Sequence, residues 1–147
     1  MTTTDDAGAG STVGADGAGA PGVTEGEVRL EVPASPEFLR VARMMAAGVA
    51  SRLGFTLEEV DDLRIAIDEL CFCLVGRTGR PGTVAIRYVM RPDGLAVEGV
   101  GHFTDHANEE PRLSPLSLQI LKAVTDECHV EGGPDGPTFR LLKRQRV

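Results

Sequence analysis

Residues 63–75 read LRIAIDELCFCLV, and this stretch carries the most information about the fold and the function of the chain. Its apolar residues recur at helical spacing and predict a largely buried helix. Two adjacent carboxylates, Asp68 and Glu69, nevertheless lie within it. Because an unpaired carboxylate is costly to bury, the pair points to chemistry or to the remains of it.

The composition sets limits on the function. The 147 residues suit one domain. Hydrophobic residues make up 41% of the chain and aromatic residues only 4%, so we expect a core of aliphatic side chains. The net charge of -7 argues against non-specific nucleic-acid binding, which needs Lys and Arg to neutralise phosphates. The charge fits a protein with a basic partner, and it fits an ordinary acidic soluble protein equally well.

The cysteines and histidines give no sign of a disulfide framework or a metal site. The three cysteines, Cys71, Cys73 and Cys128, are too few and too irregularly spaced for a framework. Cys71 and Cys73 face different directions on the predicted helix, so we expect inert core residues rather than metal ligands. His102 and His106 lie in a polar segment and supply too few ligands for a metal. With no signal peptide or long apolar span, the sequence predicts a protein of the reducing cytoplasm, away from membranes.

Two parts of the chain differ sharply in composition. Residues 1–26 are rich in Gly, Ala, Thr and Asp and contain no Lys or Arg, which is typical of a disordered acidic tail. We expect the folded domain at residues 27–147. Periodicity and turn signals there predict strands over residues 28–32, 83–90, 95–100, 128–130 and 138–143, and helices over residues 36–53, 57–75 and 115–126.

Local signals mark where the predicted helices begin. Ser35 and Ser114 are N-cap residues followed by proline, and Thr56 with Glu59 forms a capping box. The order of elements is not a regular βαβ alternation. It predicts an α/β (α+β) fold, a two-layer sandwich in which helices cover one face of a mixed or antiparallel sheet.

The apolar positions predict which helix faces are buried. In the first helix they form one stripe: Phe38, Val41, Ala42, Met45, Ala46, Val49, Ala50 and Leu53. In the second helix, Ile65 and Phe72 widen the stripe, so we expect that helix to be more enclosed. The basic residues near the end of the chain are predicted to lie on a solvated strand end, with a contact to the acidic tail as the alternative; they are Arg140, Lys143, Arg144 and Arg146.

Residues 68–73 resemble the N-box helix of the GHKL ATPase superfamily, above all that of the bacterial anti-sigma factors with serine/threonine kinase activity, the RsbW-like family. That helix runs Asp-Glu-x-x-x-Asn; Asp68 and Glu69 match it, and Cys73 stands at the Asn position. The resemblance covers about residues 28–145 and implies a GHKL (Bergerat) ATPase-like fold. It implies that Glu69 is the catalytic general base and that Asp68 and Cys73 are ATP-site positions. Because magnesium prefers hard oxygen ligands, the Cys73 sulfur should weaken the metal–phosphate contact.

The second element of the family, Asp-x-Gly-x-Gly, corresponds to residues 97–103, which read VEGVGHF. Aligned on Gly101, Gly99 replaces the aspartate and Phe103 replaces the second glycine. Glu98 could substitute for the aspartate only from the other face of the strand. By this resemblance Gly99 and Gly101 are vestigial cofactor-binding positions. The alternative is that they are glycines that let a strand end bend.

The third element is the lid Gly-x-Gly-Leu-x-Leu, and the matching residues 113–118 read LSPLSL. The leucines remain, but both glycines are gone. Because Pro115 fixes the backbone and removes an N–H donor, this segment should not wrap phosphates.

All three elements depart from the ATP-binding pattern, and the resemblance then implies a binding protein. Such an anti-sigma factor sequesters an RNA polymerase sigma factor and is countered by an anti-anti-sigma protein. We expect no cofactor, although the family resemblance leaves ATP and magnesium open. Family analogy implies a homodimer, with the helix at residues 36–53 as the contact surface. Two alternatives stay open: an active ATP-dependent serine/threonine protein kinase that phosphorylates the anti-anti-sigma protein, and an unrelated small α/β domain.

Overall fold

The computed structural model describes residues 26–105 and 110–146. The predicted tail, apart from Gly26, lies outside the described residues, as does His106. The elements follow in the predicted order: β2 (Gly26–Pro33), α2 (Pro36–Arg52), α3 (Leu57–Val75), β3 (Gly82–Arg91), β4 (Gly94–Phe103), α4 (Pro115–Val124), β5 (Glu127–Gly133) and β6 (Gly136–Arg144).

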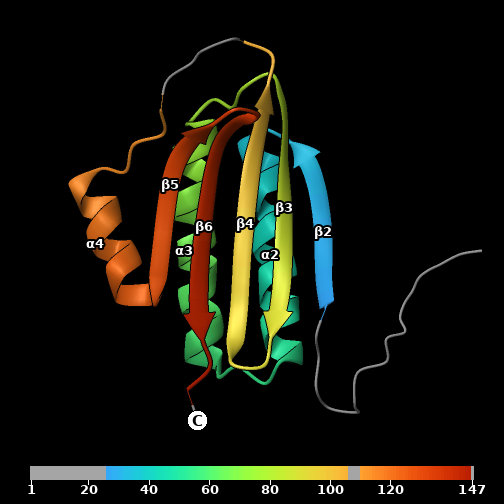
Figure 1. Ribbon diagram of the computed structural model, residues 1–147, viewed down its shortest axis with the longest axis vertical. Coiled ribbons are helices and arrows are strands. Elements are labelled where there is room, and N and C mark those ends of the chain that lie inside the picture. The colour runs from blue at the N-terminus through green and yellow to red at the C-terminus, as the bar shows by residue number, and fades with distance from the viewer. Residues whose placement is uncertain (1–25, 106–109, 147) are drawn as a thin grey trace, which may run out of the picture.

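The strands form one five-stranded sheet with the order β2-β3-β4-β6-β5. Each neighbouring pair is antiparallel, so the antiparallel form of the predicted sheet is the one observed. Helices α2 and α3 cover one face of the sheet, and α4 stands beside the β5 edge (Figure 1). The predicted α+β two-layer sandwich is therefore confirmed.

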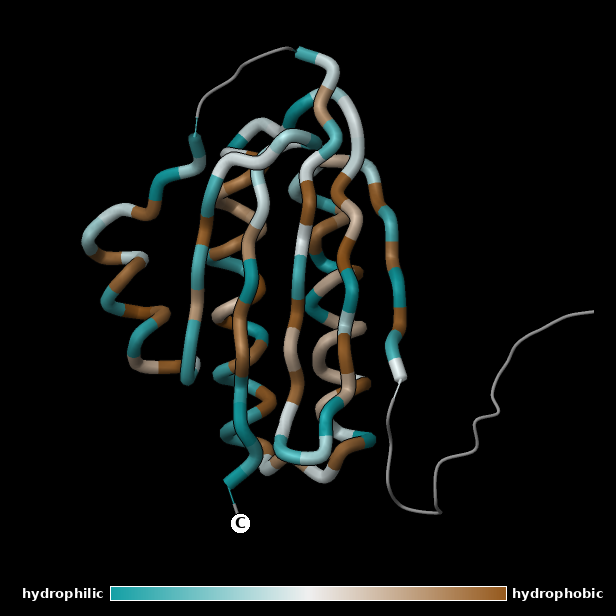
Figure 2. The backbone as a smooth tube through the Cα atoms, in the orientation of Figure 1, coloured by the Kyte–Doolittle hydropathy of each residue, from teal (hydrophilic) through white to brown (hydrophobic). Residues whose placement is uncertain are grey.

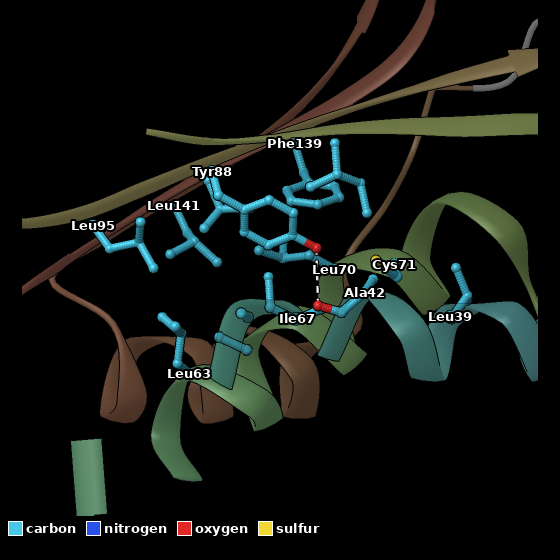
Figure 3. Packing of buried hydrophobic residues seen from close by; sticks show 14 of the residues in the cluster. Leu39, Ala42, Leu63, Ile67, Leu70, Cys71, Tyr88, Leu95, Phe139 and Leu141 are labelled. Atoms are coloured by element: carbon cyan, nitrogen blue, oxygen red, sulfur yellow. Dashed lines mark hydrogen bonds between the residues drawn. The ribbon is translucent and has the colours of Figure 1, made fainter. Parts of the chain in front are cut away.

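Alternation along the strands separates a core face from an open face. Hydrophobic and hydrophilic residues alternate along the central strands (Figure 2). In β3 the side chains of Val84, Ile86 and Tyr88 are almost fully buried beneath the helices. Tyr88 donates a hydrogen bond from its hydroxyl to the Ala42 carbonyl oxygen at 2.9 Å, which satisfies the one polar atom it brings into the core (Figure 3).

Helix α3 begins at the predicted capping box. Thr56 Oγ1 accepts a hydrogen bond from the Glu59 backbone N–H at 3.1 Å, and Glu59 Oε1 accepts one from the Thr56 N–H at 2.8 Å. Ser114 likewise caps α4 by accepting from the Ser117 N–H at 3.0 Å. Ser35 occupies the N-cap position of α2 but makes no cap bond, since its hydroxyl donates to Glu37 Oε1 instead.

The predicted apolar stripes are wider than the faces that the fold buries. In α2 the innermost residues are Leu39, Ala42, Ala46, Val49 and Ala50, whereas Phe38 and Val41 are about 40% exposed. Helix α2 packs on β2 and β3 near one edge of the sheet, and within residues 26–105 and 110–146 part of its apolar surface stays exposed. In α3, Ile65 and Phe72 are exposed, so they do not belong to the buried face. The helix is nevertheless more enclosed than α2, as predicted, because more of its residues are buried.

The strands extend further than predicted, and α4 is shorter. β4 continues through Gly101 to Phe103, because these residues pair with the beginning of β3. β5 continues to Gly133 before the turn to β6, and α4 ends at Val124 rather than Asp126.

The end of β6 is solvated as the sequence predicts at Arg140, Arg144 and Arg146, but not at Lys143. Lys143 is only 3% exposed. Its ammonium donates to the Val124 carbonyl oxygen at 2.9 Å and lies 3.3 Å from Asp62 Oδ2.

Among the described residues, none of the helices is long and apolar enough to cross a membrane.

Candidate functional site

Helix α3 directs the adjacent carboxylates of its motif toward different surroundings. Asp68 faces α2, where Arg43 Nη1 donates to Asp68 Oδ2 at 3.1 Å. The Asp68 side chain is 47% exposed, so the expectation of a pair of buried carboxylates is wrong. Partial burial raises the pKa of the Asp68 carboxyl, against the opposing effect of Arg43. Asp68 thus acts as one half of an interhelical ion pair.

Glu69 lies one helical turn before Cys73 and is partly buried. Within residues 26–105 and 110–146, no hydrogen bond or ion pair reaches its carboxylate. A general base needs to be oriented toward the proton that it removes. In the described part of the chain, nothing orients Glu69 in this way.

Cys73 lies at the rim of the core rather than within it. The side chain is partly buried, and its Sγ lies 3.2 Å from the Arg112 carbonyl oxygen, to which the thiol donates. Burial raises the pKa of the Cys73 thiol and, more strongly, that of Cys71, to about 12. Both thiols therefore stay protonated and unreactive at neutral pH. The core placement predicted for both cysteines holds fully only for Cys71.

A cavity of about 770 Å³ opens beside Cys73, at the end of α3. Its wall includes Cys73, Gly76, Arg80, Glu110, Arg112 and Pro137. Arg80 is held from two sides: its guanidinium lies 4.0 Å from the centre of the Phe103 ring and donates to both Asp105 carboxylate oxygens at 2.7 and 2.9 Å. The cavity thus has a fixed cation and a thiol in its wall, and the N-box resemblance assigns the position of that thiol to a magnesium ligand.

Gly99 and Gly101 line up on the helix-facing side of β4, and two aromatic rings occupy the space beside them. A Cβ on Gly99 would lie 2.3 Å from the Phe139 ring, and a Cβ on Gly101 would lie 2.4 Å from the Phe103 ring. Phe139 is 1% exposed and packs between the sheet and the helices (Figure 3). The glycines therefore make room for the rings, which differs from both the nucleotide role and the bending role considered from sequence.

The helix-facing side of β4 carries no acidic residue, however the Asp-x-Gly-x-Gly motif is aligned along the strand. Its side-chain positions, read alternately along the strand, are Leu95, Val97, Gly99, Gly101 and Phe103. Glu98 lies on the open face, where it accepts from Arg87 Nη1 at 2.8 Å. The strand therefore offers no carboxylate that could hold an adenine amine beneath the helices.

The donor set does not fit a magnesium–ATP complex. Magnesium takes oxygen ligands, and Cys73 presents a protonated sulfur that is already bonded to a backbone carbonyl. At the lid, Leu116 is 65% exposed and Pro115 is the first residue of α4. Among the described residues, no cluster of His, Cys, Asp and Glu could hold a metal ion.

Sequence reasoning missed the partners of the motif residues. Arg43 lies in α2, Phe139 in β6 and Arg80 in the loop before β3. Their sequence separations from Asp68, Gly99 and Asp105 are 25 or more. The motif itself contains no signal for them. The one available hint was Arg43, because it is the only charged residue among the apolar and small residues at positions 41–50 and therefore needs a partner.

Comparisons with known proteins place the chain among its relatives. No family model matches it. It is similar to the serine-protein kinase RsbW of Oceanobacillus iheyensis, at 45% identity over 116 residues that cover 78% of this chain and 65% of that protein. The RsbW proteins of Bacillus pumilus and Bacillus subtilis are each 29% identical, over 82% and 79% of this chain and 88% and 84% of theirs.

Among solved structures, the fold matches a Mycobacterium tuberculosis protein that contains RsbU and RsbW domains. The TM-score is 0.58, with 14% identity over 82% of this chain. The match spans about a third of that longer protein, 32% of its chain. At this identity the likeness shows the fold alone, and it supports the GHKL-like architecture predicted from the motif.

Proposed function

Because the chain belongs to the RsbW-like family of bacterial anti-sigma factors and serine/threonine kinases, we propose that it is an anti-sigma factor that works by binding. In this proposal it sequesters an RNA polymerase sigma factor, and an anti-anti-sigma protein competes for it and releases the sigma factor. Its nucleotide site is degenerate. The cytoplasm, where RNA polymerase acts, is the location that goes with this function.

The observation that carries the proposal is the state of Cys73. The family places a magnesium ligand here, and this chain places a thiol whose proton is donated to the Arg112 carbonyl oxygen. The rings of Phe139 and Phe103 beside Gly99 and Gly101 support the same conclusion. A protein that keeps the core of this fold but lacks the metal and adenine contacts can still bind a partner protein through its surface.

A second function, an ATP-dependent kinase of the anti-anti-sigma protein, has two observations in its favour. Glu69 keeps the family's general-base residue, and the cavity beside Cys73 is lined by Arg80 and Arg112, which favour anions. Against it, the donors present do not fit magnesium. In this alternative Glu69 would accept the proton from the hydroxyl of the substrate.

The two functions separate in a competition assay. The purified full chain is mixed with candidate sigma factors from its own organism, with and without Mg-ATP, and the complex is followed by size-exclusion chromatography. We expect a sigma complex that forms without nucleotide, dissociates when the anti-anti-sigma protein is added, and leaves that protein unphosphorylated by mass spectrometry. Phosphorylation that the Glu69→Gln variant abolishes would establish the kinase. Failure to bind any sigma factor would refute the anti-sigma function.

We also propose that the chain forms a homodimer through α2 and the edge strand β2. A shallow, almost wholly apolar groove runs along this edge, lined by Val28, Val41, Met44, Met45, Gly48 and Met90. Met44 is 67% exposed, and Phe38 beside the groove is 41% exposed. Exposed apolar surface of this kind favours association. Analytical ultracentrifugation should show a dimer for the native chain and a monomer for Met44→Glu. A native monomer at micromolar concentration would contradict the proposal.

A further inference from the structure

Helix α4 is held at both ends by contacts that need no nucleotide. At its start, the Cys73 thiol donates to the carbonyl oxygen of Arg112, three residues before the helix. At its end, the buried Lys143 ammonium donates to the carbonyl oxygen of Val124, the last helical residue. A cation at this position satisfies an unpaired carbonyl and interacts favourably with the negative end of the helix dipole.

The Lys143 ammonium also links α4 to α3. Asp62 Oδ2 lies 3.3 Å from Lys143 Nζ, so one ammonium joins a carboxylate on α3 to the end of α4. The neighbouring Glu59, three residues before Asp62, reaches the same end of β6 and accepts from the Arg146 backbone N–H at 2.9 Å. Because the Lys143 ammonium is buried, the loss of a partner would leave its charge poorly compensated, so this arrangement is costly to open.

We propose that Lys143 and Asp62 form a latch that fixes α4 against α3, so that the fold itself, without a bound nucleotide, sets the position of the lid helix. Lys143 is a positioning residue in this account. The consequence for regulation rests on the proposed function: a sigma factor or anti-anti-sigma protein that contacts α4 meets one surface, whether or not ATP is present.

The latch is tested by amide hydrogen exchange of the full chain, read by mass spectrometry in peptides from α4 and α2. Lys143→Met removes the ammonium and keeps the apolar stem. We expect exchange in α4 to accelerate about tenfold or more, since a charge-assisted hydrogen bond and an ion pair are lost together, with α2 unchanged. Arg144→Met is the matched control, because the Arg144 side chain is exposed and pairs only with surface acids. It should leave α4 as in the native chain.

Two further arms keep the result decisive. Asp62→Asn retains the bond from Lys143 to the Val124 carbonyl oxygen and should give a smaller acceleration confined to α4. It also replaces Lys143→Met if that variant does not fold. Adding millimolar Mg-ATP to the native chain should leave α4 exchange unchanged.

Unchanged α4 exchange in Lys143→Met, or in Asp62→Asn where it stands in for that variant, would overturn the latch. So would an equal rise in α4 and α2, which indicates general destabilisation. Slower α4 exchange with Mg-ATP would overturn the claim of a nucleotide-independent lid. None of these measurements uses a partner, so the failure of sigma binding counts against the proposed function alone.

Discussion

The two halves of α3 use their carboxylates in opposite ways. Near its start, Glu59 is 5% exposed and accepts hydrogen bonds from two backbone N–H groups, while Asp62 meets the buried Lys143. About two turns after Asp62, Asp68 is half-exposed and paired with one arginine, and Glu69 has no hydrogen-bond or ion-pair partner among the described residues. Glu59 and Asp62, which bond to groups at the end of β6, stabilise the fold, whereas we expect Asp68 and Glu69 to contribute little to it.

This contrast teaches that a motif and a burial argument can point to different residues of the same helix. The sequence drew attention to Asp68 and Glu69 because they interrupt an apolar stretch. Of the acids that the fold depends on, Glu59 is marked in the sequence only as part of a capping box, and Asp62 is marked by no pattern. The predictions below measure how large the difference is.

The largest effect should come from Glu59. Glu59→Ala removes the acceptor of the Thr56 N–H in the capping box and the acceptor of the Arg146 N–H, and leaves two partly buried N–H groups without these partners. We expect a loss of about 2–4 kcal/mol in the free energy of unfolding, measured by urea denaturation. Glu58→Ala, at an exposed position in the same helical turn, should cost less than about 1 kcal/mol. Equal losses would remove the distinction between the two positions.

The same residue predicts a dependence on pH. Hydrogen bonds from backbone N–H groups, that of Thr56 first, lower the pKa of Glu59 below its ordinary value of 4.5. A lowered carboxyl pKa in the folded state means that the unfolded chain binds the proton more readily. The stability supplied by Glu59 is therefore complete above pH 4.5 and is lost as the pH falls through the lower folded-state pKa. Below pH 4.5, unfolding curves of Glu59→Ala should depend less on pH than those of the native chain; identical slopes would contradict this.

A somewhat smaller effect is expected at Gly99. The Cβ of Gly99→Ala would overlap the Phe139 ring and should cost about 1–3 kcal/mol of stability. Combining it with Phe139→Leu should return part of the loss, because the smaller side chain opens the space. A double-mutant cycle by thermal unfolding measures this coupling. If the two losses simply add, the ring is not what requires a glycine at this position.

The smallest effect is expected at the motif itself. Arg43→Ala leaves Asp68 without its partner, but that pair is half-exposed, so the loss should be about 1 kcal/mol or less. Asp68→Asn should cost even less at pH 7. Burial raises the pKa of Asp68, so the folded state binds the proton more readily than the unfolded chain. Ionisation of Asp68 as the pH rises therefore adds nothing to the stability of the fold. A loss at Asp68 as large as that at Glu59 would show that the motif supports the fold.

The fold was largely predictable because it depends on local signals. The capping box at Thr56, the Ser114 cap and the alternation in β3 each place one element, and their order limits the architecture to a sheet covered by helices. What failed depends on the surroundings of an element. Phe38 and Leu39 both continue a helical stripe, and only the position of α2 at the sheet edge decides that Leu39 is the buried one.

The contacts of the motif residues could not be predicted from the sequence. The position of Cys73 in the motif was enough to question the magnesium ligand, but not to show that its thiol meets Arg112, 39 residues away. In the same way, Gly99 and Phe139 meet only because β4 pairs with β6. Lys143 shows the limit most clearly, since a lysine in a basic terminal run gives no sign that it will be buried.

The most direct test of the central claim, a kinase-like scaffold without a magnesium–nucleotide site, is calorimetric titration of the native chain with Mg-ATP, accompanied by its melting temperature. Ligand at a hundredfold excess over its Kd stabilises a protein by about 2.7 kcal/mol, which is readily detected. The account predicts no binding heat and no rise in Tm at millimolar Mg-ATP. A rise of several degrees that disappears when magnesium is chelated would contradict it.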